Sequence, residues 1–329
     1  MSKRLFSILS RIVISVALLF FLFQHADLDL KKLWDIIRAS DIFFLVIAAI
    51  LTLLTHILCI FRWGILLRDI GIILSWLRIV ISFSGGLFFN LFLPSTIGGD
   101  VLRTADLSAS TNRPREILAT VFLDRLSGYV GLVIVALFAS FLGHSFLQTR
   151  VVIFSVGLIT LTLVLILLVL FNNAIYLRIN SWLAVAKIEK GATRFKQSLD
   201  RLRNYLKELH EEIYLFRNKR ASIITNVFLS ILIQLLGPLT CYFVALSLGV
   251  RITPLVFFIF LPIISAITLL PISIGGLGLR DASTVFFFSQ VGLAKELALS
   301  ISLVNFFLLV FYSAIGGVIY VSTVHHRRI

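Results

Sequence analysis

The sequence predicts an all-α polytopic membrane protein in which a unit of span, re-entrant hairpin and span occurs twice, in inverted orientation. Hydrophobic residues make up 59% of the 329 residues and the mean hydropathy is +1.04, whereas soluble domains are roughly 45–50% apolar. Long apolar stretches recur along the whole chain, so a bilayer is its natural solvent. A motif at 94–103 recurs at 271–280, which indicates two related halves.

Six stretches each hold close to the roughly 20 apolar residues that cross a hydrocarbon core. The first follows Lys3 and Arg4 and resembles a signal peptide, but the segment after it, 24–27, offers no small-x-small cleavage site. We therefore expect a retained first span. The predicted spans are 5–23, 42–61, 117–142, 151–171, 221–248 and 297–324.

Two further apolar runs, 79–93 and 254–270, lead directly into the two copies of the motif. The shared pattern is Pro-x-Ser/Thr-Ile-Gly-Gly-x-x-Leu-Arg, and the copies begin at Pro94 and Pro271, two of only six prolines. Proline ends the preceding helix, and a glycine pair allows tight turns and close backbone approach. Breaker-rich segments at corresponding places in two halves indicate the binding site of a membrane transporter.

The distribution of positive charge predicts the topology of these two runs. The segment 172–220 is the most basic loop, with Lys and Arg well in excess of Asp and Glu, and should be cytoplasmic. If the N-terminus is cytoplasmic, the segment 172–220 is also cytoplasmic only if 79–93 turns back rather than crosses the membrane. The first unit, 42–142, then starts outside and the second, 221–324, starts inside. The hairpins enter from opposite sides, and their Gly-Gly turns could meet near the midplane, as in an alternating-access translocator.

The chain is thus predicted to form one membrane domain, 1–329, with both termini cytoplasmic. Within the connecting segment, apolar residues at steps of three and four predict an amphipathic helix over 187–216. It either packs on the protein itself or lies at the anionic headgroup layer. The predicted divisions are 1–41 (first span and outer loop), 42–142 (first repeat), 143–220 (connecting span and basic helix), 221–324 (second repeat) and 325–329 (tail).

Arg103 and Arg280 occupy equivalent places one turn beyond the glycine pairs. A guanidinium pairs bidentately with phosphate, and a helix starting after the glycines presents free amides to an anion. Alternatively, each arginine reaches its own interface or pairs with a neighbouring acid, Asp100 or Asp281. The predicted substrate-binding set is Arg103, Arg280, Gly98, Gly99, Gly275, Gly276, Ser95, Thr96 and Ser273.

Asp124 and Arg125 lie within the third predicted span, where charges are costly and usually face the bundle interior. They are either gating groups or an ion pair that holds helices together. The second unit has Ile301 and Ser302 at these places, so the halves should not be functionally equivalent. The predicted gating or coupling set is Asp100, Asp124, Arg125, Asp281, Pro94 and Pro271.

Several classes of function lack their sequence signals. There is no HExxH, P-loop, GxSxG or Cys/His zinc spacing, so we expect no cofactor, no metal and a role other than catalysis. Cys59 and Cys241 sit in apolar stretches and are expected to be buried free thiols. No basic, aromatic-interleaved soluble domain is present, so nucleic acid is not an expected partner.

Three segments carry a resemblance to a known family. They are FNLFLPSTIGGDVLRTADL at 89–107, ATVFLDRLSGYVGLVIVALFA at 119–139 and LLPISIGGLGLRDASTVFFF at 269–288. With the span layout they make the chain resemble the lysylphosphatidylglycerol synthase transmembrane family, also known as the UPF0104 family. Its best-known relatives carry this region as the flippase portion of the multiple peptide resistance factor. The family's Gly-Gly-Asp, Arg and Asp/Glu-Arg positions would map onto Gly98, Gly99, Asp100, Arg103, Asp124 and Arg125.

The resemblance implies a protein of the cell membrane that moves lipids between leaflets or assists lipid-linked sugar or aminoacyl-lipid pathways. The bifunctional relatives append a soluble aminoacyl-transfer domain, whereas this sequence stops at Ile329, so aminoacylation is not expected. We predict a translocator of an anionic phospholipid or polyprenyl-linked lipid. The alternatives are a membrane-embedded transferase using Asp100 or Asp124 as base, and a scaffold for envelope-synthesis enzymes.

Overall fold

The computed structural model describes residues 30–91, 98–143, 150–172, 177–178, 219–268 and 276–325. Within these residues the elements are all helices, and five are long and apolar enough to cross a membrane. The all-helical, multi-pass prediction is thereby confirmed for five of the six expected spans, and 5–23 and 187–216 lie outside the described residues. The five helices are α3 (Ile42–Asp69), α6 (Pro114–Leu142), α7 (Arg150–Phe171), α10 (Arg220–Ser247) and α13 (Lys295–His325).

Helix α3 differs most from its predicted range, because it continues well past residue 61. The Asp41 side chain caps its start by accepting a hydrogen bond from the Phe43 amide at 2.8 Å. The chain turns only beyond Asp69, where Gly71 adopts a φ of 76° that glycine allows at little cost. The predicted span 42–61 therefore ended too early. Arg62 lies inside α3 and is buried.

Two pairs of shorter helices correspond to the predicted hairpin segments. Helices α4 (Trp76–Asn90) and α5 (Gly98–Thr111) run antiparallel, with Arg78 bonded to Asp106 at 2.7 Å near one end and Gly86 against Gly99 near the other. Each is about 20 Å long, too short for the roughly 30 Å hydrocarbon core.

Helices α11 (Pro254–Thr268) and α12 (Leu279–Ser289) form the second antiparallel pair. The rings of Phe257 and Phe288 lie 5.0 Å apart, and those of Phe260 and Phe287 lie 5.4 Å apart. At the other end of the pair, Thr268 approaches Gly276.

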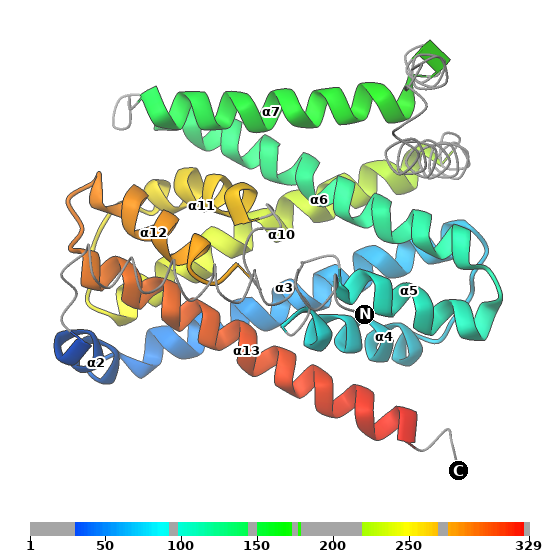
Figure 1. Cartoon of the computed structure of the whole chain (residues 1–329), viewed down its shortest axis with the longest axis horizontal. Helices are drawn as coiled ribbons and strands as arrows, with labels where there is room; N and C mark the ends of the chain where they lie inside the picture. The colour runs from blue at the N-terminus through cyan, green and yellow to red at the C-terminus, as the bar shows by residue number, and fades with distance from the viewer. Residues whose placement is uncertain are drawn as a thin grey trace, which may run out of the picture.

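The two helical pairs lie at opposite ends of the bundle. Helices α3 and α10 are antiparallel, since Ser222 donates to Asp69 at 2.8 Å at one end and the Asp41 amide donates to the Ser247 carbonyl at 2.7 Å at the other. The α4–α5 pair follows the Asp69 end of α3, whereas the α11–α12 pair follows the Ser247 end of α10. Figure 1 shows the pairs on opposite sides, with α3, α6, α10 and α13 running between them.

Helices α6 and α13 each contact both helical pairs. Helix α6 packs on α5 and α11, and α13 packs on α12 and α4. Glycines allow the close approaches: a Cβ on Gly131 would lie 2.7 Å from the Ser230 backbone of α10, and one on Gly316 would lie 2.9 Å from the Ser84 carbonyl of α4. Small residues of this kind are typical of helix interfaces within membranes.

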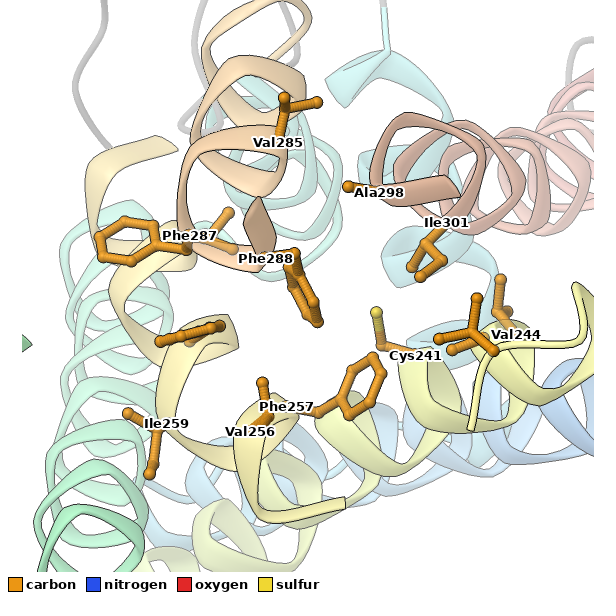
Figure 2. Close-up of a cluster of buried hydrophobic side chains, with 14 of the residues drawn as sticks. Cys241, Val244, Val256, Phe257, Ile259, Val285, Phe287, Phe288, Ala298 and Ile301 are labelled. Carbon is orange, nitrogen blue, oxygen red and sulfur yellow. The ribbon is translucent and has the colours of Figure 1, made fainter. Parts of the chain in front are cut away.

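The largest apolar core lies where α10, α11, α12 and α13 meet. Phe257 of α11 and Phe288 of α12 point into it together with Cys241 of α10 and Ile301 of α13 (Figure 2). Cys241 is a buried free thiol, as predicted, and Cys59 is a free thiol that is only partly buried. The short helix α2 (Leu30–Arg38) contributes Leu33 to this core and joins the start of α13 through Lys32 and Glu296, 3.0 Å apart.

Candidate functional site

Five charged side chains converge inside the bundle from three helices. We call them the charged network: Arg62 of α3, Asp100 and Arg103 of α5, and Asp124 and Arg125 of α6. Helix α5 begins at the motif's glycine pair rather than after it, and the Asn90 side chain at the end of α4 accepts from the Gly99 amide at 2.7 Å. This contact helps to hold the start of α5, and with it Asp100 and Arg103, against α6.

Asp124 lies at the centre of the charged network. One of its carboxylate oxygens accepts from Arg62 Nε at 2.8 Å, and the other accepts from Arg103 Nη2 at 3.1 Å. Arg62 also donates to the Ser230 hydroxyl of α10 at 2.8 Å. One carboxylate therefore connects α3 and α5 to α6, and Arg62 carries the connection on to α10.

Asp100 forms the second centre of the charged network. It accepts from Arg125 Nε at 2.8 Å and from Arg125 Nη2 at 3.1 Å, and it lies 3.1 Å from Arg103 Nη2. The neighbours Asp124 and Arg125 thus each pair with other helices. Arg125 is the most exposed member, with 38% of its side chain accessible against 10% or less for the others.

Among the described residues, the charged network has one more positive than negative charge, because three guanidinium groups face two carboxylates. Arg103 Nε is buried and has no hydrogen-bond partner among the described residues. The Arg103 guanidinium instead lies over the Trp63 ring, 4.7 Å from its centroid. A positive surplus at membrane depth is costly unless an anion balances it, so the charged network suits an anionic ligand.

A second, smaller cluster lies where α12 meets α13. Arg280 Nη2 donates to Asp281 at 2.9 Å, the Ser302 hydroxyl donates to the same carboxylate at 2.6 Å, and the Gly278 amide donates to its other oxygen at 2.9 Å. Arg280 Nε also donates to Ser302 at 3.2 Å. We call Arg280, Asp281 and Ser302 the Arg280 cluster, and it carries no net charge.

The Arg280 cluster borders a cavity of about 170 Å³ between α10, α11, α12 and α13. Pro238 and Pro262, which interrupt the hydrogen bonding of α10 and α11, line it. Its polar lining residues include Arg280, Ser302, Asn305, Gln234, Thr268 and Thr284. A cavity of this size beside a guanidinium can hold a phosphate or carboxylate group.

Comparison with known proteins places the chain in a family. The model of the lysylphosphatidylglycerol synthase TM region matches residues 8–316. The chain belongs to this family. Its curated relatives include a UPF0104 membrane protein of Pyrococcus horikoshii, 24% identical over 89% of this chain and 90% of the relative.

Two further relatives come from other organisms. UPF0104 membrane proteins of Methanothermobacter thermautotrophicus and Methanocaldococcus jannaschii are each 23% identical, over 82% and 90% of this chain and 81% and 89% of the relatives. No solved structure matches the chain.

In this member of the family, the two motif arginines have separate sets of partners. Arg103 belongs to the charged network, whereas Arg280 belongs to the cluster on α12 and α13. Both pair with neighbouring acids, which is the alternative that the sequence left open. Gly98 and Gly99 begin α5, and Gly276 has a φ of 77°. Pro94, Ser95, Thr96, Pro271, Ser273 and Gly275 lie outside the described residues.

Sequence reasoning missed two participants. Arg62 escaped notice because the predicted span ended one residue before it, although the helical pattern continues to Asp69. Ser302 occupies the place in the second unit where the first unit has a charged residue, and it was not among the predicted site residues. In the structure it hydrogen-bonds with both Arg280 and Asp281. Within the described residues, no group of three or more His, Cys, Asp or Glu side chains is arranged to hold a metal.

Proposed function

We propose that this chain is a lipid translocator that moves an anionic or phosphate-bearing lipid between membrane leaflets. The observation that carries the proposal is the positive surplus of the charged network, which lies between the membrane-spanning helices α3 and α6 and the short helix α5. A lipid phosphate would balance that surplus through charge-assisted hydrogen bonds, which are strong where water is excluded. The headgroup would pass between the charged network and the Arg280 cavity.

We further propose that the α4–α5 and α11–α12 pairs are re-entrant hairpins of an inverted repeat. Their lengths support this, because each arm is shorter than the hydrocarbon core. The packing supports it as well, because α6 contacts α5 and α11 in the way that α13 contacts α12 and α4. Rocking of the hairpins about their glycine contacts would open the site alternately to each face.

The basic segment 172–220 supports a cytoplasmic position for that loop and for both termini. Under this orientation the α4–α5 pair would enter from the cytoplasm and the α11–α12 pair from the opposite side.

A membrane-embedded transferase is less well supported by the same contacts. Its general base would need a carboxylate able to take a proton from a substrate. Asp100 and Asp124 each already contact two guanidinium groups, so neither carboxylate is left without a partner to face a substrate.

The translocator is tested by reconstituting the full chain into liposomes and following leaflet exchange of fluorescent phospholipids by chemical quenching. We expect faster exchange of an anionic lipid than in empty liposomes. Arg280→Gln, which leaves the charged network intact, should slow it, and Arg103→Gln should slow it further.

Arg38→Gln on the exposed end of α2 is the matched control and should exchange at the parental rate. Exchange no faster than in empty liposomes, across phosphatidylglycerol, phosphatidylserine and a polyprenyl phosphate, would refute the proposal. Metal-dependent formation of a modified lipid in the same liposomes would favour the transferase instead.

A further inference from the structure

An apolar groove lies on the side of the bundle between α6, α7 and α11. It has a volume of about 420 Å³, within the range of roughly 300–1,000 Å³ that is typical of small-molecule sites. Tyr129 of α6, Ile267 of α11 and the α7 residues from Phe154 to Ile166 line it. Phe154 is 71% exposed, so the groove opens to the outer surface of these apolar helices, where acyl chains are the solvent.

The dimensions of the groove suit a single acyl chain. From Phe154 to Ile166 it follows α7 for about 18 Å, close to the roughly 15 Å thickness of one leaflet's hydrocarbon. A transmembrane helix is about 10 Å wide and 30 Å long, which is several times the groove's volume.

One end of the groove approaches the charged network. Tyr129 lines the groove and lies one helical turn from Arg125, on the same face of α6. Leu126, the next residue after Arg125, belongs to the same packed cluster as Leu163 of the groove. Arg125 is also the member of the charged network with the most accessible side chain. A phosphate at Arg125 and an acyl chain in the groove could therefore belong to one lipid.

We propose that this groove holds one acyl chain of an anionic phospholipid whose phosphate lies at the Arg125 side of the charged network. The inference rests on the proposed function in taking this lipid to be the transported one. Moving a chain from the bilayer into an apolar groove gains little hydrophobic free energy, because lipid tails are equally apolar. Selection must come from pairing between the guanidinium and the phosphate, so occupancy of the groove depends on headgroup charge.

The test is photo-crosslinking of the full chain in nanodiscs with phospholipids that carry a diazirine on one acyl chain. Labelled peptides are mapped by mass spectrometry for phosphatidylglycerol and, separately, for phosphatidylcholine. We expect phosphatidylglycerol to label groove residues of α7 and α11 several-fold more than phosphatidylcholine does. Ile153, which is 66% exposed on α7 and does not line the groove, should be labelled equally by both lipids.

Two kinds of variant test separately the contribution of the groove and that of the Arg125 charge to the selective labelling. Ala266→Trp places a large side chain in the groove without touching the charged network, and should abolish the selective labelling. Arg125→Gln should remove the preference for phosphatidylglycerol. Because that change leaves Asp100 with one guanidinium partner, the double variant Asp100→Asn with Arg125→Gln is measured beside it. Arg38→Gln and Ile153→Trp are the matched controls and should keep the parental pattern.

Equal labelling by the two lipids would overturn the proposal, because it would identify ordinary bilayer contact. Absence of label from the groove would also overturn it, including the case in which the label falls on 5–23 instead. The leaflet-exchange assay separates this inference from the proposed function. Selective labelling without exchange supports the lipid site and refutes transport, whereas exchange with unselective labelling refutes only the groove.

Discussion

The charged network and the Arg280 cluster surround corresponding arginines of a repeated motif, yet their electrostatics differ. In the charged network around Arg103, three guanidinium groups pair with two carboxylates, which leaves one positive charge in excess among the described residues. Around Arg280, one acid and one hydroxyl suffice, and the guanidinium borders a cavity. The same backbone motif therefore supports a crowded charged junction in one place and a neutral, open one in the other. The first is suited to attracting an anion and the second to giving it room.

The largest expected effect comes from removing the centre of the charged network. Asp124→Asn leaves Arg62 and Arg103 without their shared carboxylate in a buried site, and breaking a buried pair costs about 3–5 kcal/mol. We expect a large fall in the thermal unfolding temperature of the detergent-purified protein. Asp35→Asn on the exposed side of α2 is the control and should change little. Equal melting of the parent and Asp124→Asn would mean that the network does not hold the helices together.

A smaller effect is expected at the matching acid of the other cluster. Asp281→Asn weakens the bonds from Arg280, Ser302 and the Gly278 amide. The Arg280 side chain is 19% exposed beside its cavity and can be partly solvated, so we expect a loss of about 1–3 kcal/mol. The same melting measurement checks it. A larger loss than that of Asp124→Asn would reverse the comparison between the two clusters.

The motif glycines Gly99 and Gly276, which lie where each pair turns back, should respond for different reasons. A Cβ on Gly99 would lie 2.0 Å from the Gly86 carbonyl, so Gly99→Ala must push α4 and α5 apart. Overpacking of this kind costs about 1–3 kcal/mol. We expect a lower melting temperature of the detergent-purified protein. An unchanged melting temperature of Gly99→Ala would show that the close approach is not needed.

The smallest effect is expected at Gly276. Its Cβ would have room, with the nearest atom of Thr268 at 3.6 Å, but its φ of 77° is strained for any residue with a side chain. Gly276→Ala should therefore cost about 1–2 kcal/mol through the backbone alone. The melting temperature should fall less than for Gly99→Ala. An unchanged melting temperature would indicate that the backbone relaxes to negative φ.

Much of the fold follows from local sequence. Hydropathy is a sum over neighbouring residues, so the ranges of α6, α7, α10 and α13 agree with the predicted spans to within a few residues. Proline and glycine act on the residues next to them, so the interruptions after 79–93 and 254–270 were also predictable. The end of α3 was not, because a single arginine in an apolar run does not end a helix.

The pairing of the charges was decided by tertiary structure. The sequence alone identified Asp124 and Arg125 as costly charges within a span and Asp100 and Arg103 as candidate site residues of the motif. Which partner each one finds depends on how α3, α5 and α6 cross, and no local pattern encodes that. Packing brought Arg62 to Asp124 across 62 positions, and it gave Ser302 a role that its residue type did not suggest. Local hydrophobicity determined where the chain crosses the bilayer, and long-range packing determined which charges meet there.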